Sequence, residues 1–247
     1  LMIRRWHTFL KMQARVAGQL RYIVTVSKCS AADIGTAFGV LPGALHVVPN
    51  GVDTDLFKPL PDVVRHPKTI IATASADAPL KGLPVLLKAF KILCEDDPAH
   101  RLVLIARPKP GGDTEALISR LGLAERIRFV GDASHQDINR LYAQSTVAVV
   151  PSLYEGFGLP AIEAMAAGVP LVSSDGGALA EVVADGGLLV PAGDSEALAQ
   201  ALARVLSDPA FAQTLSDRGR QRVVSEFCWS VCAKQMVQQY RSCIDAC

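Results

Sequence analysis

The sequence lacks an excess of charge of either sign and lacks any long apolar run. Its 247 residues include 25 Lys and Arg against 24 Asp and Glu, a net charge of +1. Such a balance produces no overall field that attracts nucleic acid or an acidic membrane surface, so any phosphate binding must be local. No apolar run approaches the ~18 to 20 residues that a membrane-spanning helix needs. We therefore predict no membrane span and no nucleic-acid partner.

Metal-ligand spacings and a dinucleotide-binding fingerprint are missing as well. The five histidines show no metal spacing, and no G-x-G-x-x-G follows a first strand, which argues against a dinucleotide-dependent dehydrogenase. Four of the six cysteines form the pairs Cys228 with Cys232 and Cys243 with Cys247. In a single helix over 229–247 these pairs lie roughly 20 Å apart, too far to share one zinc. We expect reduced cysteines, no metal and no cofactor.

The chain is apolar enough to fold, and its opening stretch carries no targeting signal. Half of the residues are apolar, enough for one large core or two modest ones. The opening LMIRRWHTFLKMQARVAG has no small-residue cleavage site, which predicts a cytoplasmic protein. It starts at Leu1 without a helix cap, so we expect a fragment. The opening stretch has basic residues beside Trp6 and Phe9. This pattern fits a peripheral helix at the inner face of a membrane, where a lipid acceptor would bind, but it fits a helix packed between domains better.

Short β-branched apolar runs alternate with longer stretches of helical period. This alternation predicts an α/β fold, a doubly wound, Rossmann-like parallel sheet covered on both faces. Ser134 and Ser195 are expected as helix N-caps, and Gly39, Gly122 and Gly168 at helix C-terminal ends. The predicted strands are 22–26, 45–49, 69–75, 101–106, 126–131, 146–151, 170–174 and 188–191. The predicted helices lie near 29–38, 82–95, 113–121, 134–144, 160–168, 178–184, 195–207, 209–225 and 229–244.

The elements divide into unequal parts. Residues 51–64 follow an Asn-Gly turn, contain two prolines and show no helical period, so they are predicted to be a connector. Residues 65–228 suffice for a complete doubly wound domain, whereas 1–50 hold only two short strands and two helices. We expect 1–50 to be the remnant of another domain and 229–247 to be a terminal helix that packs back toward it.

The segment TVAVVPSLYEGFGLPAIEAMAAGVP has the order strand, Gly-containing loop, helix. Ligands bind beyond the carboxyl ends of parallel strands, where a helix N-terminus offers unpaired N–H groups to phosphate. Gly156 and Gly158 would permit a close backbone approach and a positive φ. Glu155 on the loop and Glu163 one turn into the helix can face one pocket, where carboxylates accept hydroxyl hydrogen bonds. Taken alone, the segment fits equally well a helix with a solvated first-turn glutamate after a charged loop.

The spacing of Glu155 and Glu163 resembles the E-x7-E signature of the family 4 retaining glycosyltransferases, which have the GT-B fold. The resemblance covers nearly the whole chain, including IVTVSKCSAADI, HVVPNGVDTDLFKP, LKGLPVLLKAF and LLVPAGDSEALAQAL. It implies the C-terminal, donor-binding half of such an enzyme with a truncated N-terminal acceptor domain. The implied reaction transfers a sugar from a nucleoside diphosphate sugar to a glycan, lipid or small-molecule acceptor, with retention, front-face attack and no required metal.

The resemblance also implies roles for individual residues. Glu163 would bind the ribose hydroxyls and Glu155 the transferred sugar. Lys81, in SADAPLKG, looks like the lysine that neutralises the diphosphate, although its spacing alone fits an ordinary surface lysine. Backbone groups would hold the sugar hydroxyls, the phosphates and the edge of the base. These groups belong to Gly156, Phe157, Gly158 and Leu159 and, at the end of a strand, to Phe129, Val130 and Gly131.

One departure from the family removes a cation. Ser75 and Ala76 stand where the family usually has Gly-Arg, and the Arg is a second diphosphate contact. We hypothesise that Arg107 or Lys109, in the loop after another strand, compensates. A non-catalytic nucleotide-sugar-binding domain and a GT-B epimerase or phosphorylase remain the alternatives.

Two further patterns are less specific. Asp53 and Asp55 spell D-x-D, a metal-diphosphate motif elsewhere, but they follow a turn and are interpreted as turn and cap residues. Gly176 and Gly177 precede a helix, and they fit the lining of a cleft and an ordinary helix start equally well.

Overall fold

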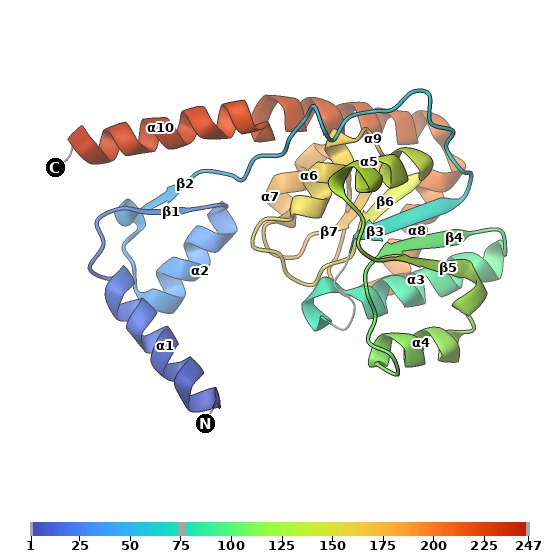
Figure 1. Cartoon of the computed structure of the whole chain (residues 1–247), viewed down its shortest axis with the longest axis horizontal. Helices are drawn as coiled ribbons and strands as arrows, with labels where there is room; N and C mark the ends of the chain where they lie inside the picture. Colours follow the sequence, from blue (N-terminus) through green and yellow to red (C-terminus); the bar gives the residue numbers. More distant parts are fainter. Residues whose placement is uncertain (1, 74–77, 246–247) are drawn as a thin grey trace.

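The computed structural model describes residues 2–73 and 78–245, and its largest element is a six-stranded parallel sheet (Figure 1). The strand order is β5-β4-β3-β6-β7-β8. From the neighbouring strands β3 and β6 the chain therefore continues outward in opposite directions, to β4 and β5 on one side and to β7 and β8 on the other. Such a reversal of strand order leaves a crevice at the carboxyl ends of the two central strands. The strands are β3 (Thr69–Thr73), β4 (Arg101–Ile105), β5 (Ile127–Val130), β6 (Val147–Val150), β7 (Leu171–Ser174) and β8 (Leu188–Val190).

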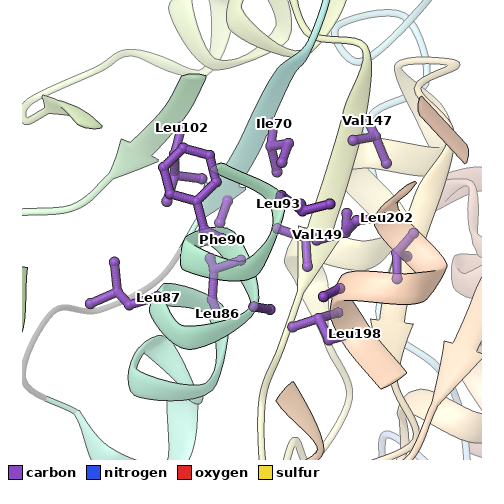
Figure 2. Close-up of a cluster of buried hydrophobic side chains, with 14 of the residues drawn as sticks. Ile70, Leu86, Leu87, Phe90, Leu93, Leu102, Val147, Val149, Leu198 and Leu202 are labelled. Carbon is purple, nitrogen blue, oxygen red and sulfur yellow. The ribbon is translucent and has the colours of Figure 1, made fainter. Parts of the chain in front are cut away.

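Helices cover both faces of this sheet because its strands are apolar on both sides. Alternate residues of a strand point to opposite faces, so Ile70 joins one core and Ile71 joins the other. The first core lies between the sheet, α3 (Leu83–Asp96) and α8 (Ser195–Ser207), and Figure 2 shows Phe90 and Leu198 from these helices within it. The remaining helices around the sheet are α4 (Asp113–Leu121), α5 (His135–Gln144), α6 (Leu159–Ala166), α7 (Leu179–Val183) and α9 (Pro209–Arg222).

The N-terminal part forms a separate small unit. It contains α1 (Met2–Ala17), β1 (Ile23–Thr25), α2 (Lys28–Phe38) and β2 (Leu45–Val47), and the two strands pair with each other in parallel. The terminal helix α10 (Trp229–Asp245) runs back over this unit (Figure 1), where the Tyr22 hydroxyl donates a hydrogen bond to the Ser242 carbonyl.

The connector and the start of α10 cross between the two units. Val52 forms an isolated bridge with Cys228, and its N–H donates to the Phe227 carbonyl at 2.8 Å. A side chain at Gly51 would lie 2.6 Å from the Trp229 ring, so the absence of one permits this crossing. The boundaries of the connector and the packing of the terminal helix toward another domain stay predictions.

The predicted strands and helices are all present, with small shifts at their ends. Ser134 caps α5 through a capping box, and Gly39, Gly122 and Gly168 have φ values of 66, 68 and 70° at or just after helix ends. The N-cap prediction for Ser195 is wrong, because the Asp194 carboxylate one residue earlier accepts from the backbone N–H groups of Glu196 and Ala197.

Three other helix and strand ends differ from the prediction or lie outside the described residues. Helix α6 begins at Leu159, one residue before Pro160. Helix α9 ends at Arg222 and continues into a π-helical turn over Val223–Phe227, so the predicted helix 209–225 changes type at its end. The last two residues of the predicted strand 69–75, including Ser75, lie outside the described residues, as do Ala76 and Cys247. The five cysteines within the described part of the chain are free.

Candidate active site

Two loops meet at the carboxyl ends of β3 and β6. The first ends in the short 3-10 helix η2 (Pro79–Lys81), and the second follows β6. The Leu153 N–H donates to the Leu80 carbonyl at 2.8 Å, which ties the loops together. Gly82 has φ of 66°, and a Cβ there would lie 1.9 Å from the Pro151 carbonyl oxygen. Only glycine permits this approach, and the approach holds Lys81 beside the loop after β6.

Lys81 and Glu155 form an ion pair in this position. Lys81 Nζ donates to Glu155 Oε1 at 2.7 Å, and Ser152 Oγ donates to the same oxygen at 2.8 Å. The Glu155 side chain is only 11% exposed, whereas the Lys81 side chain is 34% exposed. A buried carboxylate is stable only when it is paired and hydrogen-bonded, and these two donors meet that requirement. Its cationic partner still reaches solvent.

The backbone of Glu155 is held by the glycine pair before α7. Glu155 forms an isolated bridge with Gly177, and its carbonyl accepts from the Ala178 N–H at 2.8 Å. A Cβ at Gly176 would lie 2.5 Å from the Leu153 carbonyl oxygen, and one at Gly177 would lie 2.4 Å from that of Glu155. The backbone of these two glycines therefore packs directly against the backbone of the Glu155 loop.

Glu163 lies in α6, which starts from the same loop. Its N-cap residue Gly158 has φ of 104° and provides no side-chain cap, and the Leu179 side chain packs against this glycine. Glu163 is half-buried, and burial raises its pKa from 4.5 to about 7. Burial, and then the negative charge of Glu163, raises the pKa of the fully buried Tyr142. The Tyr142 hydroxyl lies 3.2 Å from Thr73 Oγ1, at the end of β3.

Arg107, Val130 and Gly131 lie together at the ends of β4 and β5. The Ala106 N–H donates to the Val130 carbonyl at 3.1 Å, and Arg107 crosses Gly131, where a Cβ would lie 3.0 Å from its Nε. The guanidinium is ion-paired with Asp132 and its side chain is 62% exposed. Arg107 thus contacts the residues that directly follow β5. The hypothesis that it replaces the missing cation stays a prediction.

The N-terminal unit contacts the site through the start of α2. Ser27 Oγ and Ser30 Oγ donate to the Gly156 carbonyl at 2.7 and 2.9 Å. The Glu181 carboxylate of α7 accepts from the backbone N–H groups of Lys28 and Cys29 at 3.2 and 2.9 Å. The Glu155 loop is therefore held by both units of the chain.

Known proteins resemble this chain along most of its length. The family described as Glycosyl transferases group 1 matches residues 61–222. The chain belongs to this family. The MMP alpha-(1->4)-mannosyltransferase of Mycolicibacterium hassiacum is 46% identical over 248 residues, which are 98% of this chain and 59% of that protein. The phosphatidyl-myo-inositol mannosyltransferase of Mycobacterium leprae is 36% identical over 79% of this chain and 53% of its own length. The chain thus spans little more than half the length of these relatives.

Solved structures confirm the GT-B fold of this group 1 glycosyltransferase chain. The sucrose-phosphate synthase of Thermosynechococcus elongatus superposes with a TM-score of 0.84 at 31% identity, covering 98% of this chain and 63% of that one. The C-terminal domain of a group 1 glycosyl transferase from Francisella tularensis superposes with a TM-score of 0.64 at 26% identity, covering 72% of this chain and all of that domain.

The structure of this family member brings some of the sequence-predicted site residues together. Lys81 pairs with Glu155 beyond β3 and β6, and Glu163 lies in α6, which begins with exposed Leu159 after the same loop. The Phe157 ring is buried against Phe227, and the role predicted for this residue concerns its backbone. Roles in binding or catalysis stay predictions for all of these residues.

Sequence reasoning missed the side chains that support the site. Ser152, Ser27, Ser30 and Glu181 hold the loop or its neighbours. Ser27 carries the one usable signal, because a serine directly before a helical stretch is typical of an N-cap. Its partner in the loop is 129 residues away and has no signal in the local sequence.

Two predictions of absence concern the whole chain. Within residues 2–73 and 78–245, no group of three or more metal-ligating side chains is arranged to hold an ion. The same part of the chain contains no helix that is long and apolar enough to cross a membrane. Metal independence and cytoplasmic location stay predictions.

Proposed function

We propose that this chain holds the donor site of a retaining glycosyltransferase that transfers a sugar from a nucleoside diphosphate sugar to a glycan, lipid or small-molecule acceptor. The observation that carries the proposal is the 2.7 Å pair of Lys81 with Glu155 beyond two neighbouring strands, on the loop that leads into the helix of the half-buried Glu163. The HepE protein of Anabaena shares the fold at 24% identity and a TM-score of 0.84, and its structures contain UDP or UDP-glucose. We infer the same class of donor here.

Each site residue has a function that its surroundings support. The diphosphate binds where the Lys81 ammonium and the Leu159 N–H at the positive end of α6 supply positive charge, which stabilises the charge that develops on the leaving group. Glu155 exchanges part of its ion pair for the hydroxyls of the sugar, and Glu163 accepts hydrogen bonds from the ribose. Val130 and Gly131 border the base. The bond from the anomeric carbon to the diphosphate breaks while the acceptor hydroxyl oxygen bonds to the same face of that carbon, and the hydroxyl proton passes to the departing diphosphate.

The rest of the enzyme supplies the acceptor site. We propose that 65–228 is the donor domain, 51–64 the connector, 1–50 a remnant of the acceptor domain and 229–247 a helix that packs toward that domain. The Francisella tularensis domain supports this division, because it is a separate C-terminal domain that matches 72% of the chain. The 247-residue chain alone should bind donor but transfer no sugar, and measurable transfer to any acceptor would refute this expectation.

A calorimetric screen of the chain tests the proposal. UDP, GDP, ADP, UDP-glucose and GDP-mannose are titrated into the wild type and into Glu163→Ala. We expect at least one nucleotide sugar to bind the wild type and the variant to lose most of that affinity. Indifference of the wild type to all five compounds contradicts the proposal.

Product analysis with the full-length protein separates the alternatives. A transferase forms a new glycosidic bond with retained configuration, whereas donor binding without turnover indicates a non-catalytic domain. An epimerase changes the sugar of the nucleotide, and a phosphorylase releases a sugar phosphate.

A further inference from the structure

The loop around Glu155 is held on both sides of that residue by one helix of the N-terminal unit. On one side the Tyr154 hydroxyl donates to the Asp33 carboxylate in α2. On the other side the Gly156 carbonyl accepts from Ser27 Oγ at 2.7 Å and from Ser30 Oγ at 2.9 Å. The residues directly before and after Glu155 are therefore both fixed from α2.

The start of α2 is in turn anchored to the large domain. Glu181 Oε2 and Oε1 accept from the N–H groups of Lys28 and Cys29, the first two residues of the helix. A carboxylate is favourable there because the first N–H groups of a helix are unpaired and carry partial positive charge. Since α7 also supports Glu155 through Ala178, the loop, α2 and α7 form a closed set of contacts.

The two serines have complementary positions in this set. Ser27 is 2% exposed and is also the N-cap of α2, because its oxygen accepts from the Ser30 N–H at 2.9 Å while its hydroxyl hydrogen points to Gly156. Ser30 lies within the helix and contributes only its hydroxyl to the loop. Together they occupy both lone pairs of one carbonyl oxygen.

We infer that Ser27 and Ser30 are positioning residues that fix the direction of the Glu155 carboxylate toward the sugar of the donor. The inference rests on the proposed function, in which Glu155 contacts that sugar. Glycine has no side chain to restrict its backbone, so the peptide after Gly156 is oriented by its hydrogen-bond partners. Without the serine hydroxyls this peptide loses both of these hydrogen bonds, and the Glu155 backbone is held only by its contacts with α7 and by the neighbouring Tyr154–Asp33 hydrogen bond. The carboxylate, which Lys81 and Ser152 contact, then has a less precise orientation. The N-terminal unit thereby influences how the donor domain holds its sugar.

The Ser30→Ala variant tests the inference, because alanine is a better helix former than serine and the fold should persist. The chain is titrated calorimetrically with UDP and UDP-glucose and with GDP and GDP-mannose. Removing one hydrogen bond to the loop should weaken nucleotide-sugar binding about threefold to tenfold. Binding of the nucleoside diphosphate alone should stay within about twofold of wild type, since its contacts do not include the Glu155 carboxylate.

Two control variants separate positioning from general stability. Ser30→Thr keeps the hydroxyl and should retain the wild-type affinity for the nucleotide sugar. Ser216→Ala removes a chemically identical bond, in which Ser216 Oγ donates to the Gly168 carbonyl at 2.7 Å, away from the Glu155 loop. Ser216→Ala should leave the affinity for the nucleoside diphosphate and the affinity for the nucleotide sugar unchanged.

The outcomes distinguish this inference from the proposed function. Equal weakening of the nucleotide and of the nucleotide sugar by Ser30→Ala, or no effect on either, overturns the positioning role alone. A wild type that binds none of the four compounds overturns the proposed function, and the positioning role with it.

Discussion

Replacing Glu163 by Gln should make stability less sensitive to pH. Burial raises the pKa of Glu163 from 4.5 to about 7 in the folded chain. As the pH rises through this window, the unfolded chain releases the proton first, so the folded state loses stability up to about pH 7. Above that pH the loss is constant, and in the Glu163→Gln variant it does not occur.

The magnitude follows from the same values. At ~1.4 kcal/mol for each pH unit, the rise from 4.5 to about 7 corresponds to at most about 3 kcal/mol. The carboxylate is half-buried, and its contact with solvent reduces this to about 2 kcal/mol. The advantage of Glu163→Gln over the wild type should therefore grow by about 2 kcal/mol between pH 5 and pH 8.

Urea unfolding of the ligand-free chain at these two pH values measures the difference. Glu125→Gln is the matched control, because Glu125 is exposed in the turn before β5 and its replacement should not alter the pH dependence. The reasoning is refuted if the free energies of unfolding of wild type and Glu163→Gln differ by the same amount at pH 5 and at pH 8. It is also refuted if the stability of the wild type relative to the variant increases from pH 5 to pH 8.

Three further outcomes follow from the site. Lys81→Ala removes the cation beside a buried carboxylate and should lower the free energy of unfolding in urea by about 1 to 3 kcal/mol; unchanged stability would mean that the 2.7 Å pair contributes nothing. Gly82→Ala forces a Cβ to within 1.9 Å of the Pro151 carbonyl, and a loss below about 2 kcal/mol in thermal or urea unfolding would contradict this packing. Nucleotide-sugar affinity, measured calorimetrically, should rise with pH and level off above about pH 7 as Glu163 ionises; an affinity that falls over pH 6 to 8 would exclude the carboxylate as the ribose acceptor.

The sequence predicted the layered fold because that information is local. The apolar runs that became β3 and β6 are buried on both faces, and such runs are typical of parallel strands. The loop with Glu155 and the helix with Glu163 were predictable for the same reason, since both follow β6 directly along the chain. The misplaced cap at Ser195 shows the limit of local signals, because Asp194 beside it is an equally good cap and the sequence does not rank the two.

Contacts between segments that lie far apart along the chain could not be predicted from local sequence signals. The Gly156 carbonyl meets hydroxyls that lie 129 and 126 residues earlier, and the Glu181 carboxylate meets N–H groups 153 and 152 residues away. These partners depend on how two units of the chain pack together. The raised pKa of Glu163 was not predictable from local signals either, because it results from burial in the folded chain.

A crystal structure of the chain with the nucleotide sugar that binds it best tests the central claim most directly. The account predicts the diphosphate at Lys81 and the start of α6, the ribose hydroxyls on Glu163 and the sugar beside Glu155. A nucleotide sugar bound elsewhere, for example in the hollow between α3 and α4 that Leu83 and Leu117 line, would contradict it.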